Sequence, residues 1–411
     1  MFRWSDCSGK VGGVMTVRMV TLQRDNRRPA VPATRLWWRF PLLVAAIASM
    51  AVGIWGGLVR LGWDWAVPGR AVVDHGAIMI GGFLGTLLGL ERAVALGLGW
   101  CYLGPAATAA GAILLLAGAP TDWGASLIWA GSGIMVIDFV FILWRQAAVF
   151  TSVMAAGAAA WMVGNTLWLA GKPIYLLVWW WMAFLVLTIV GERLELSRLL
   201  PQSLVKRATF LVAAGILVLG MLVTLRAAGL GEAMVGAGLV ALAAWLLVYD
   251  VARRTVRQTG LTRFVAVCLL TGYLFLGIGG VLAVLWAGAL PLAHGRVWMG
   301  DSLQPGLAYD AVLHAVFLGF VFAMIFGHAP IIFPAVLRVR IIFSPRFYLH
   351  LVLLEGSVAW RLACDMSGAW SMRQWAGMLN GLAILLFLAN TVASIRRRVD
   401  ESPLSIAKGL T

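Results

Sequence analysis

The sequence predicts an all-α polytopic membrane protein, and its composition and the lengths of its apolar stretches indicate this class. Of its 411 residues, 62% are hydrophobic and only 12% are charged, with a mean hydropathy of +0.91. The apolar residues run continuously over lengths of about 20, which a helix needs to cross the hydrocarbon core of a bilayer. A membrane β-barrel would instead alternate polar and apolar residues. We therefore expect one domain of about twelve transmembrane helices.

Twelve apolar stretches are long enough to be spans. In order, they cover residues 40–60, 71–90, 101–119, 124–144, 148–170, 173–191, 207–226, 231–252, 264–288, 307–327, 346–363 and 375–395. Residues 1–38 are polar and basic and lack the pattern of a secretory signal, so we expect a flexible cytoplasmic tail there. The helical domain is expected over residues 39–396, followed by a short cytoplasmic tail over residues 397–411.

The formal net charge of +15 follows membrane topology and does not indicate nucleic-acid binding. If the amino terminus is cytoplasmic, the amino-terminal tail and alternate loops hold most of the 32 lysines and arginines, which is the positive-inside pattern. Both termini are then expected in the cytoplasm. We expect the lipid bilayer as a partner and no nucleic acid.

Several function classes lack their sequence signals. The longest non-apolar stretch between spans, roughly residues 289–306, is too short for a soluble catalytic domain. Phosphate-cradling loops, zinc-type histidine spacing and a nucleophilic triad are not found. The four cysteines (Cys7, Cys101, Cys268 and Cys364) are far apart, so neither a disulfide framework nor a covalent c-type haem is supported.

Two histidines hold matching positions in different spans. His75 opens the second stretch and His314 the tenth, in a chain with only five histidines. Both stretches run from outside to inside in the expected topology, so both side chains should lie at a similar depth near the outer face. Intramembrane ionisable residues usually face a protein interior or a cofactor, and imidazoles are common axial ligands of haem iron. The sequence predicts a haem site at His75 and His314; isolated interfacial histidines are the alternative.

Glycines and tryptophans provide further expectations. Gly82 lies about two turns beyond His75 and is the candidate for the haem-facing side, whereas the GxxxG pair Gly85 and Gly89 suits helix packing. The triplet at residues 179–181 (Trp-Trp-Trp) is expected in an interfacial aromatic belt, and the alternative is that one or two of these rings pack against a haem edge.

Two motifs make the chain resemble a known family. They are His75-Gly76 with Met79 and Gly82-Phe83, and His314 with Gly319, Met324 and Gly327-His328. On these motifs the chain resembles the twelve-helix core subunit of the haem-copper oxidases, and more closely their NnrS-like relatives linked to nitric oxide metabolism. The resemblance spans all twelve stretches. It implies a haem-copper-oxidase-like bundle with a low-spin haem near the outer face of a bacterial inner membrane.

The chain departs from the oxidases at the catalytic metal centre. The sixth and seventh stretches, which carry copper ligands in the oxidases, contain no histidine here. Val312 and Val316 stand where a high-spin haem ligand would lie two residues from His314. We therefore expect one non-covalent haem b and no copper, and oxygen or nitric oxide reduction by the standard mechanism is in doubt.

Charged residues near the two histidines could complete a haem site. Haem carboxylates need cationic partners, and the resemblance places such arginines at Arg361 and Arg373, although interfacial snorkelling is the alternative. Asp74 and Asp310 could each accept an imidazole N–H and orient a ligand, or could be solvated residues at helix starts.

A second group lies toward the cytoplasmic side. His328 ends the tenth span, His350 begins the eleventh, and Glu355 follows near the midplane. The two histidines could be ligands of a second metal or haem, and Glu355 could relay protons. The alternative is that the histidines are interfacial anchors and Glu355 is a hydrogen-bonding strut.

The function expected from these residues is haem binding in a nitric oxide response linked to denitrification, or in membrane electron transfer. An oxidoreductase role is possible. The candidate partners are a quinone or a periplasmic electron-transfer protein. The alternative function is a proton-coupled secondary transporter without haem, in which Asp138 and Glu355 are the protonation sites.

Overall fold

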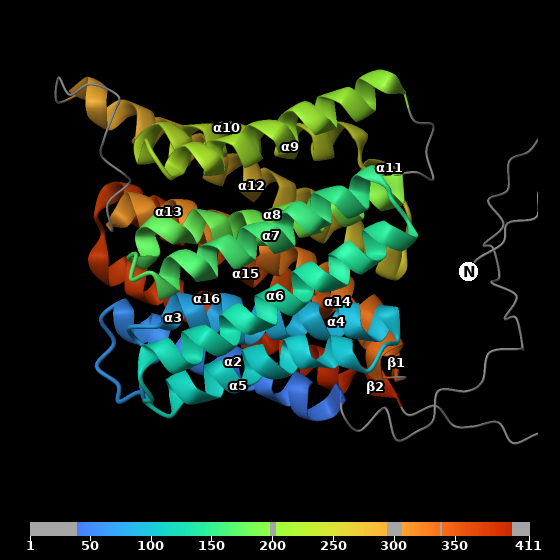
Figure 1. Ribbon diagram of the computed structural model, residues 1–411, viewed down its shortest axis with the longest axis horizontal. Helices are drawn as coiled ribbons and strands as arrows, with labels where there is room; N and C mark the ends of the chain where they lie inside the picture. The colour runs from blue at the N-terminus through green and yellow to red at the C-terminus, as the bar shows by residue number, and fades with distance from the viewer. Residues whose placement is uncertain (1–38, 198–202, 294–305, 338, 397–411) are drawn as a thin grey trace, which may run out of the picture.

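The chain folds into a bundle of long helices that run side by side (Figure 1). The computed structural model describes residues 39–197, 203–293, 306–337 and 339–396. The connecting turns gather at the two opposite ends of the bundle (Figure 1). The prediction of an all-α fold is confirmed.

The helices of the first half are α2 (Arg39–Arg60), α3 (His75–Ala77), η1 (Ile78–Gly85), α4 (Thr86–Leu96), η2 (Trp100–Tyr102), α5 (Leu103–Leu116), α6 (Thr121–Arg145), α7 (Val149–Leu169) and α8 (Ile174–Leu196). Those of the second half are α9 (Leu204–Thr224), α10 (Ala228–Tyr249), α11 (Ala252–Thr255), α12 (Gly260–Ala293), α13 (Leu307–His314), η4 (Ala315–Phe322), α14 (Ala323–Leu337), α15 (Phe347–Ser367) and α16 (Trp370–Ala393). Two short strands, β1 (Arg340–Ile341) and β2 (Ile395–Arg396), pair antiparallel.

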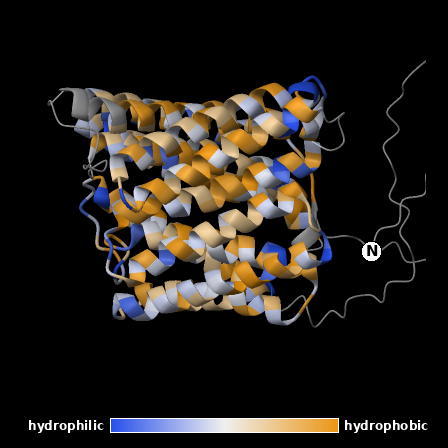
Figure 2. Cartoon of the chain, turned by 45° about the horizontal axis from the view of Figure 1, so that its top comes forward, coloured by the Kyte–Doolittle hydropathy of each residue, from blue (hydrophilic) through white to orange (hydrophobic). Residues whose placement is uncertain are grey.

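Each of the twelve expected stretches corresponds to a helix or to a continuous run of helices. Within the described residues, ten of these are long and apolar enough to cross a membrane, which makes the chain a multi-pass membrane protein. The other two are α5, which is a shorter apolar helix, and α7. Figure 2 shows hydrophobic residues along the length of the bundle and most hydrophilic residues near its ends.

Helix α8 forms much of the interior of the bundle. Trp179, Trp180 and Trp181 are all buried, so the expectation that they form an interfacial aromatic belt is wrong. The indole N–H of Trp181 donates to Asn165 Oδ1 of α7 at 2.9 Å. These tryptophans therefore fill the interior and tie α8 to α7, because their neighbours on all sides are other helices.

The two helices that carry His75 and His314 share an uncommon feature. Each contains an eight-residue π-helical segment, η1 just after His75 and η4 directly after His314. The two segments meet where the rings of Phe83 and Phe322 lie 5.9 Å apart. π-Helical turns are rare and occur frequently at functional sites. Figure 1 shows α3 and α13 at the same end of the bundle, as the predicted equal depth of the two histidines requires.

Candidate functional site

A cavity of about 550 Å³ lies between the helices that carry the two histidines. Its walls come from α2, α3, η1, α8, α13, η4, α15 and α16, and they are mostly apolar. His75, His314, Arg361 and Arg373 all line it. The structure thus gathers four of the five residues predicted to bind a cofactor, although they lie in four different parts of the sequence.

Hydrogen bonds fix the orientation of both imidazoles. His75 Nδ1 lies 2.7 Å from the carbonyl oxygen of Gly53 in α2, and His314 Nδ1 lies 2.9 Å from the carbonyl oxygen of Asp310 one turn earlier. A carbonyl oxygen can only accept a hydrogen bond, so Nδ1 is the donor in each ring. Each Nε2 then keeps its lone pair, and this is the form of histidine that binds a metal.

Gly57 of α2 makes room for the His75 ring. A Cβ atom at Gly57 would lie 2.8 Å from His75 Cε1, which is closer than a real Cβ contact. Any larger residue at this position would displace the ring. The sequence did not predict that α2 takes part in the site. The only feature that could have indicated it is the glycine-rich run over residues 53–57.

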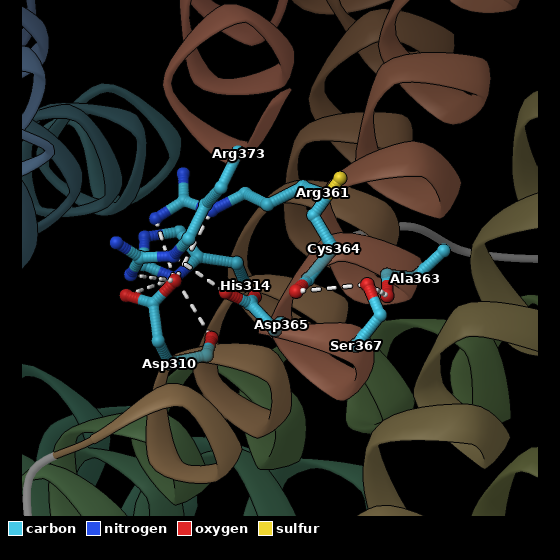
Figure 3. Close-up of polar contacts among 8 residues, drawn as sticks. All are labelled: Asp310, His314, Arg361, Ala363, Cys364, Asp365, Ser367 and Arg373. Atoms are coloured by element: carbon cyan, nitrogen blue, oxygen red, sulfur yellow. Dashed lines mark hydrogen bonds and ion pairs between the residues drawn. The ribbon is translucent and has the colours of Figure 1, made fainter. Parts of the chain in front are cut away.

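A group of buried and partly buried charged side chains lies beside His314 (Figure 3). Asp310 Oδ2 accepts hydrogen bonds from Nη2 and Nε of Arg361 at 2.7 and 3.1 Å, and lies 2.9 Å from Nη2 of Arg373. Asp310 Oδ1 is 3.2 Å from His314 Nδ1. Arg373 also donates to Asp365, whose side chain is fully buried. Asp310 therefore connects one imidazole to both predicted carboxylate-binding arginines.

Three further residues that line the cavity were not predicted from the sequence. Arg60 ends α2 and donates to the carbonyl oxygen of Val72, and Tyr309 and Trp370 also line the cavity. The guanidinium of Arg373 lies 5.3 Å from the ring centre of Trp370. These residues follow no spacing that the sequence could reveal, because each comes from the end of a different helix.

Two predicted residues have other roles. Gly82 does not line the cavity: a Cβ there would lie 2.6 Å from Ala112 Cβ of α5, so Gly82 allows close helix packing. Asp74 precedes the first residue of α3, and its side chain accepts a hydrogen bond from Arg70 at 2.6 Å instead of capping the helix. Its carboxylate does not orient His75, which bonds to Gly53 instead.

The second predicted group consists of His328, His350 and Glu355, and each of these residues has its own contacts. His328 Nδ1 bonds to the Met324 carbonyl oxygen at 2.7 Å, and Glu355 Oε1 accepts a hydrogen bond from Thr271 at 3.1 Å. The Glu355 Oε2 atom is buried without a hydrogen-bond partner.

His350 is fully buried, and the rings that surround it belong to Phe264, Phe326, Phe347 and Phe387. Among the described residues, no group of three or more His, Cys, Asp or Glu side chains is placed to hold a metal. The inner histidines are therefore not assembled into a site of that kind. His294 lies outside the described residues.

Comparison with known proteins gives one match. A family model described as a domain of unknown function (DUF8744) matches residues 39–396, which is the whole helical bundle. No curated protein and no solved structure matches the chain.

Proposed function

We propose that this chain, which belongs to the DUF8744 family, is an integral membrane protein that binds one haem b non-covalently through His75 and His314. One observation carries the proposal. A single cavity collects two imidazoles with Nδ1 engaged and two buried arginines, which come from the separate helices α3, α13, α15 and α16. An isolated interfacial histidine would need none of these neighbours.

The residues present fit the proposed cofactor. Small-molecule and cofactor pockets usually measure about 300–1,000 Å³ and are mostly apolar with a few placed polar groups. The cavity of about 550 Å³ has this character. His75 and His314 would supply the axial nitrogens, and Arg361 and Arg373 would hold the carboxylates through charge-assisted hydrogen bonds. When bound, the haem would supply one-electron redox chemistry.

The protein's own contribution is to orient these groups and to limit the access of water. Asp310 bonds to His314 and holds Arg361 and Arg373, so it sets the positions of a ligand and of the anion-binding groups together. Two histidine ligands favour electron transfer, with a quinone or a periplasmic electron-transfer protein as partner. The resemblance to NnrS-like proteins also makes a nitric oxide response a candidate role, which would require one histidine to leave the iron.

The absence of a copper site is part of the proposal. Helices α8 and α9 contain no histidine, so they cannot supply the imidazoles that hold copper in the oxidases. The haem-copper-oxidase-like arrangement would then be retained around the low-spin haem alone.

The test is an optical spectrum of the full chain, purified in mild detergent from cells supplied with haem precursor. We expect a low-spin haem spectrum, one haem per chain by pyridine haemochrome assay, and iron without stoichiometric copper. A colourless protein that also fails to take up added haem would contradict the proposal and favour the transporter alternative. Stoichiometric copper would contradict the proposed absence of a copper site.

A further inference from the structure

Exposed arginines form a patch at the end of the bundle opposite the cavity. The arginine patch consists of Arg207, Arg253, Arg254, Arg257 and Arg263. They belong to the start of α9, to α11, to the turn after α11 and to the start of α12. Helices α9 and α12 both pack against α10, and α11 packs against α12, so the five side chains lie at neighbouring helix ends on one side of the bundle. Figure 2 shows hydrophilic residues gathered where these helices end.

Among the described residues, no ion pair links an arginine of the patch to a carboxylate. Between residues 203 and 263 the only acidic residues are Glu232, which is buried near the other end of α10, and Asp250. Asp250 is also buried, and its two oxygens lie 2.9 Å from Nε and Nη2 of Arg193. The Arg253 guanidinium donates to the Val248 carbonyl oxygen, which still leaves its charge uncompensated. The patch therefore holds five positive charges without a free carboxylate.

Another arginine at the same end of the bundle is paired with carboxylates. Arg92 of α4 forms ion pairs with Glu91 and with Glu192 of α8. The positive-inside rule accounts for basic residues on one side of the membrane, but it does not require them to collect on one flank without acidic partners. Arg92 is thus paired with carboxylates, whereas no ion pair among the described residues involves an arginine of the patch.

Apolar side chains lie next to the patch on the outward face of α9. Leu204 is 87% exposed, Val205 64% and Val212 62%, and Val248 of α10 is 51% exposed. Leu204 and Leu211 are spaced one turn to either side of Arg207 and share its face of the helix. A cationic group at the end of a helix whose exposed apolar face continues through Leu211 and Val212 suits an amphiphilic anion. A soluble anion or a nucleic acid would leave the stripe unused.

We propose that the arginine patch binds the headgroup phosphates of anionic phospholipids, whose acyl chains lie along the exposed face of α9. This inference does not depend on the haem proposal, because it uses other residues at the other end of the bundle. Each arginine near an anionic membrane surface contributes about five-fold in affinity. Removing three of them should therefore weaken binding by about 100-fold.

The test compares the full-length wild type with the triple variant Arg253→Gln, Arg254→Gln, Arg257→Gln. The matched control is Lys172→Gln, Arg226→Gln, which removes two exposed basic residues at the opposite end of the bundle. Delipidated samples are titrated with phosphatidylglycerol, phosphatidylcholine or inorganic phosphate. Native mass spectrometry counts the bound lipids, and thermal unfolding measures the stabilisation.

We expect phosphatidylglycerol to bind and stabilise the wild type and the control, with binding weakened by salt, and the triple variant to lose about 100-fold in affinity. Phosphatidylcholine and inorganic phosphate should have little effect. Equal phosphatidylglycerol binding by wild type and triple variant, an equal loss in the control, or full stabilisation by phosphate alone would each overturn the proposal. If the triple variant does not fold, the single variant Arg257→Gln should show about a five-fold loss, and no loss would count against the patch.

Discussion

At the scale of single residues, His75 and His314 are fixed by backbone carbonyl oxygens. Because the carbonyl groups of Gly53 and Asp310 can only accept, they set the tautomer of each ring and hold its orientation. A hydrogen-bond acceptor for the second ring nitrogen raises the basicity of a metal-binding histidine. Removing that acceptor typically weakens metal binding by about 10–100-fold. The ring positions are therefore set before a cofactor binds.

Replacing either proposed ligand should change the haem spectrum. We expect His75→Ala and His314→Ala each to abolish the low-spin signal or convert it to a high-spin one, because six-coordinate iron needs both nitrogens. His328→Ala is the matched control, since His328 does not line the cavity. Optical and electron paramagnetic resonance spectra of the three variants are the measurement. An unchanged spectrum in both ligand variants, at normal haem content, would remove these histidines from the site.

Asp310 should influence the haem potential through its charge. Asp310→Asn keeps an oxygen that can accept a hydrogen bond from His314. The substitution removes the negative charge beside Arg361 and Arg373. Less negative charge near the iron favours the reduced form, so the midpoint potential should rise by roughly 60 mV, which is a tenfold change for one electron. Redox titration followed by absorbance measures the shift, with Asp122→Asn, at an exposed position, as control. A potential equal to that of the wild type would show that Asp310 has only a structural role.

Glu355 offers a separate test of proton coupling. One of its oxygens accepts a hydrogen bond from Thr271, and the other is buried without a hydrogen-bond partner. If Glu355 takes up a proton when the haem is reduced, Glu355→Gln should flatten the pH dependence of the midpoint potential across the neutral range and leave the fold intact. Thr271→Val, which removes only the hydrogen-bond donor, is the comparison. Superimposable wild-type and Glu355→Gln curves would assign Glu355 a structural role.

At the scale of helices, the sequence located the spans well because length and apolar composition determine them. All twelve stretches are helical, and His75 and His314 lie at one end as their positions in those stretches predicted. The π-helical segments were not predicted, because a shift from α to π hydrogen bonding leaves no distinct residue pattern. The contribution of α2 was missed for a related reason: it acts through the backbone carbonyl of Gly53 and the small size of Gly57.

Gly82 shows how spacing alone misplaced a residue. Its distance of about two turns from His75 suggested the same helix face, but the intervening η1 segment is π-helical, so the direction of later side chains differs from that in a regular α-helix. Because a π-helix has more residues per turn than an α-helix, Gly82 does not return to the face of His75 and packs against Ser49 and Ala112. The α-helical spacing of two turns therefore does not predict the position of Gly82, because this residue lies in a π-helical segment.

A methyl group at Gly82 should destabilise the bundle without altering the haem. The new Cβ would lie 2.6 Å from Ala112 Cβ, which cannot rotate away, so Gly82→Ala should cost about 1–3 kcal/mol. Gly356→Ala is the control, because a Cβ there meets nothing within 4 Å and alanine favours the helix. Thermal unfolding and the absorbance spectrum are measured together. A shifted spectrum with unchanged stability would instead place Gly82 beside the cofactor.

At the scale of the whole molecule, the cavity and the arginine patch lie at opposite ends of the bundle. If the bundle has the orientation that the positive-inside rule predicts, the patch faces the cytoplasm, where anionic lipids give the membrane a negative surface potential. The cavity would then lie near the outer face. This orientation would let a periplasmic protein or a quinone approach the proposed haem.

The orientation can be measured by labelling single cysteines from outside the cell. Cys101, Cys268 and Cys364 are buried, so a Cys7→Ser background should react little with a membrane-impermeant maleimide. Lys172→Cys lies in the exposed turn between α7 and α8 at the cavity end, and Gln258→Cys lies in the exposed turn beside the arginine patch. We expect intact spheroplasts to label residue 172 and not residue 258, and disrupted membranes to label both. The reverse pattern would place the cavity on the cytoplasmic side, which would exclude a periplasmic electron donor and require a cytoplasmic one.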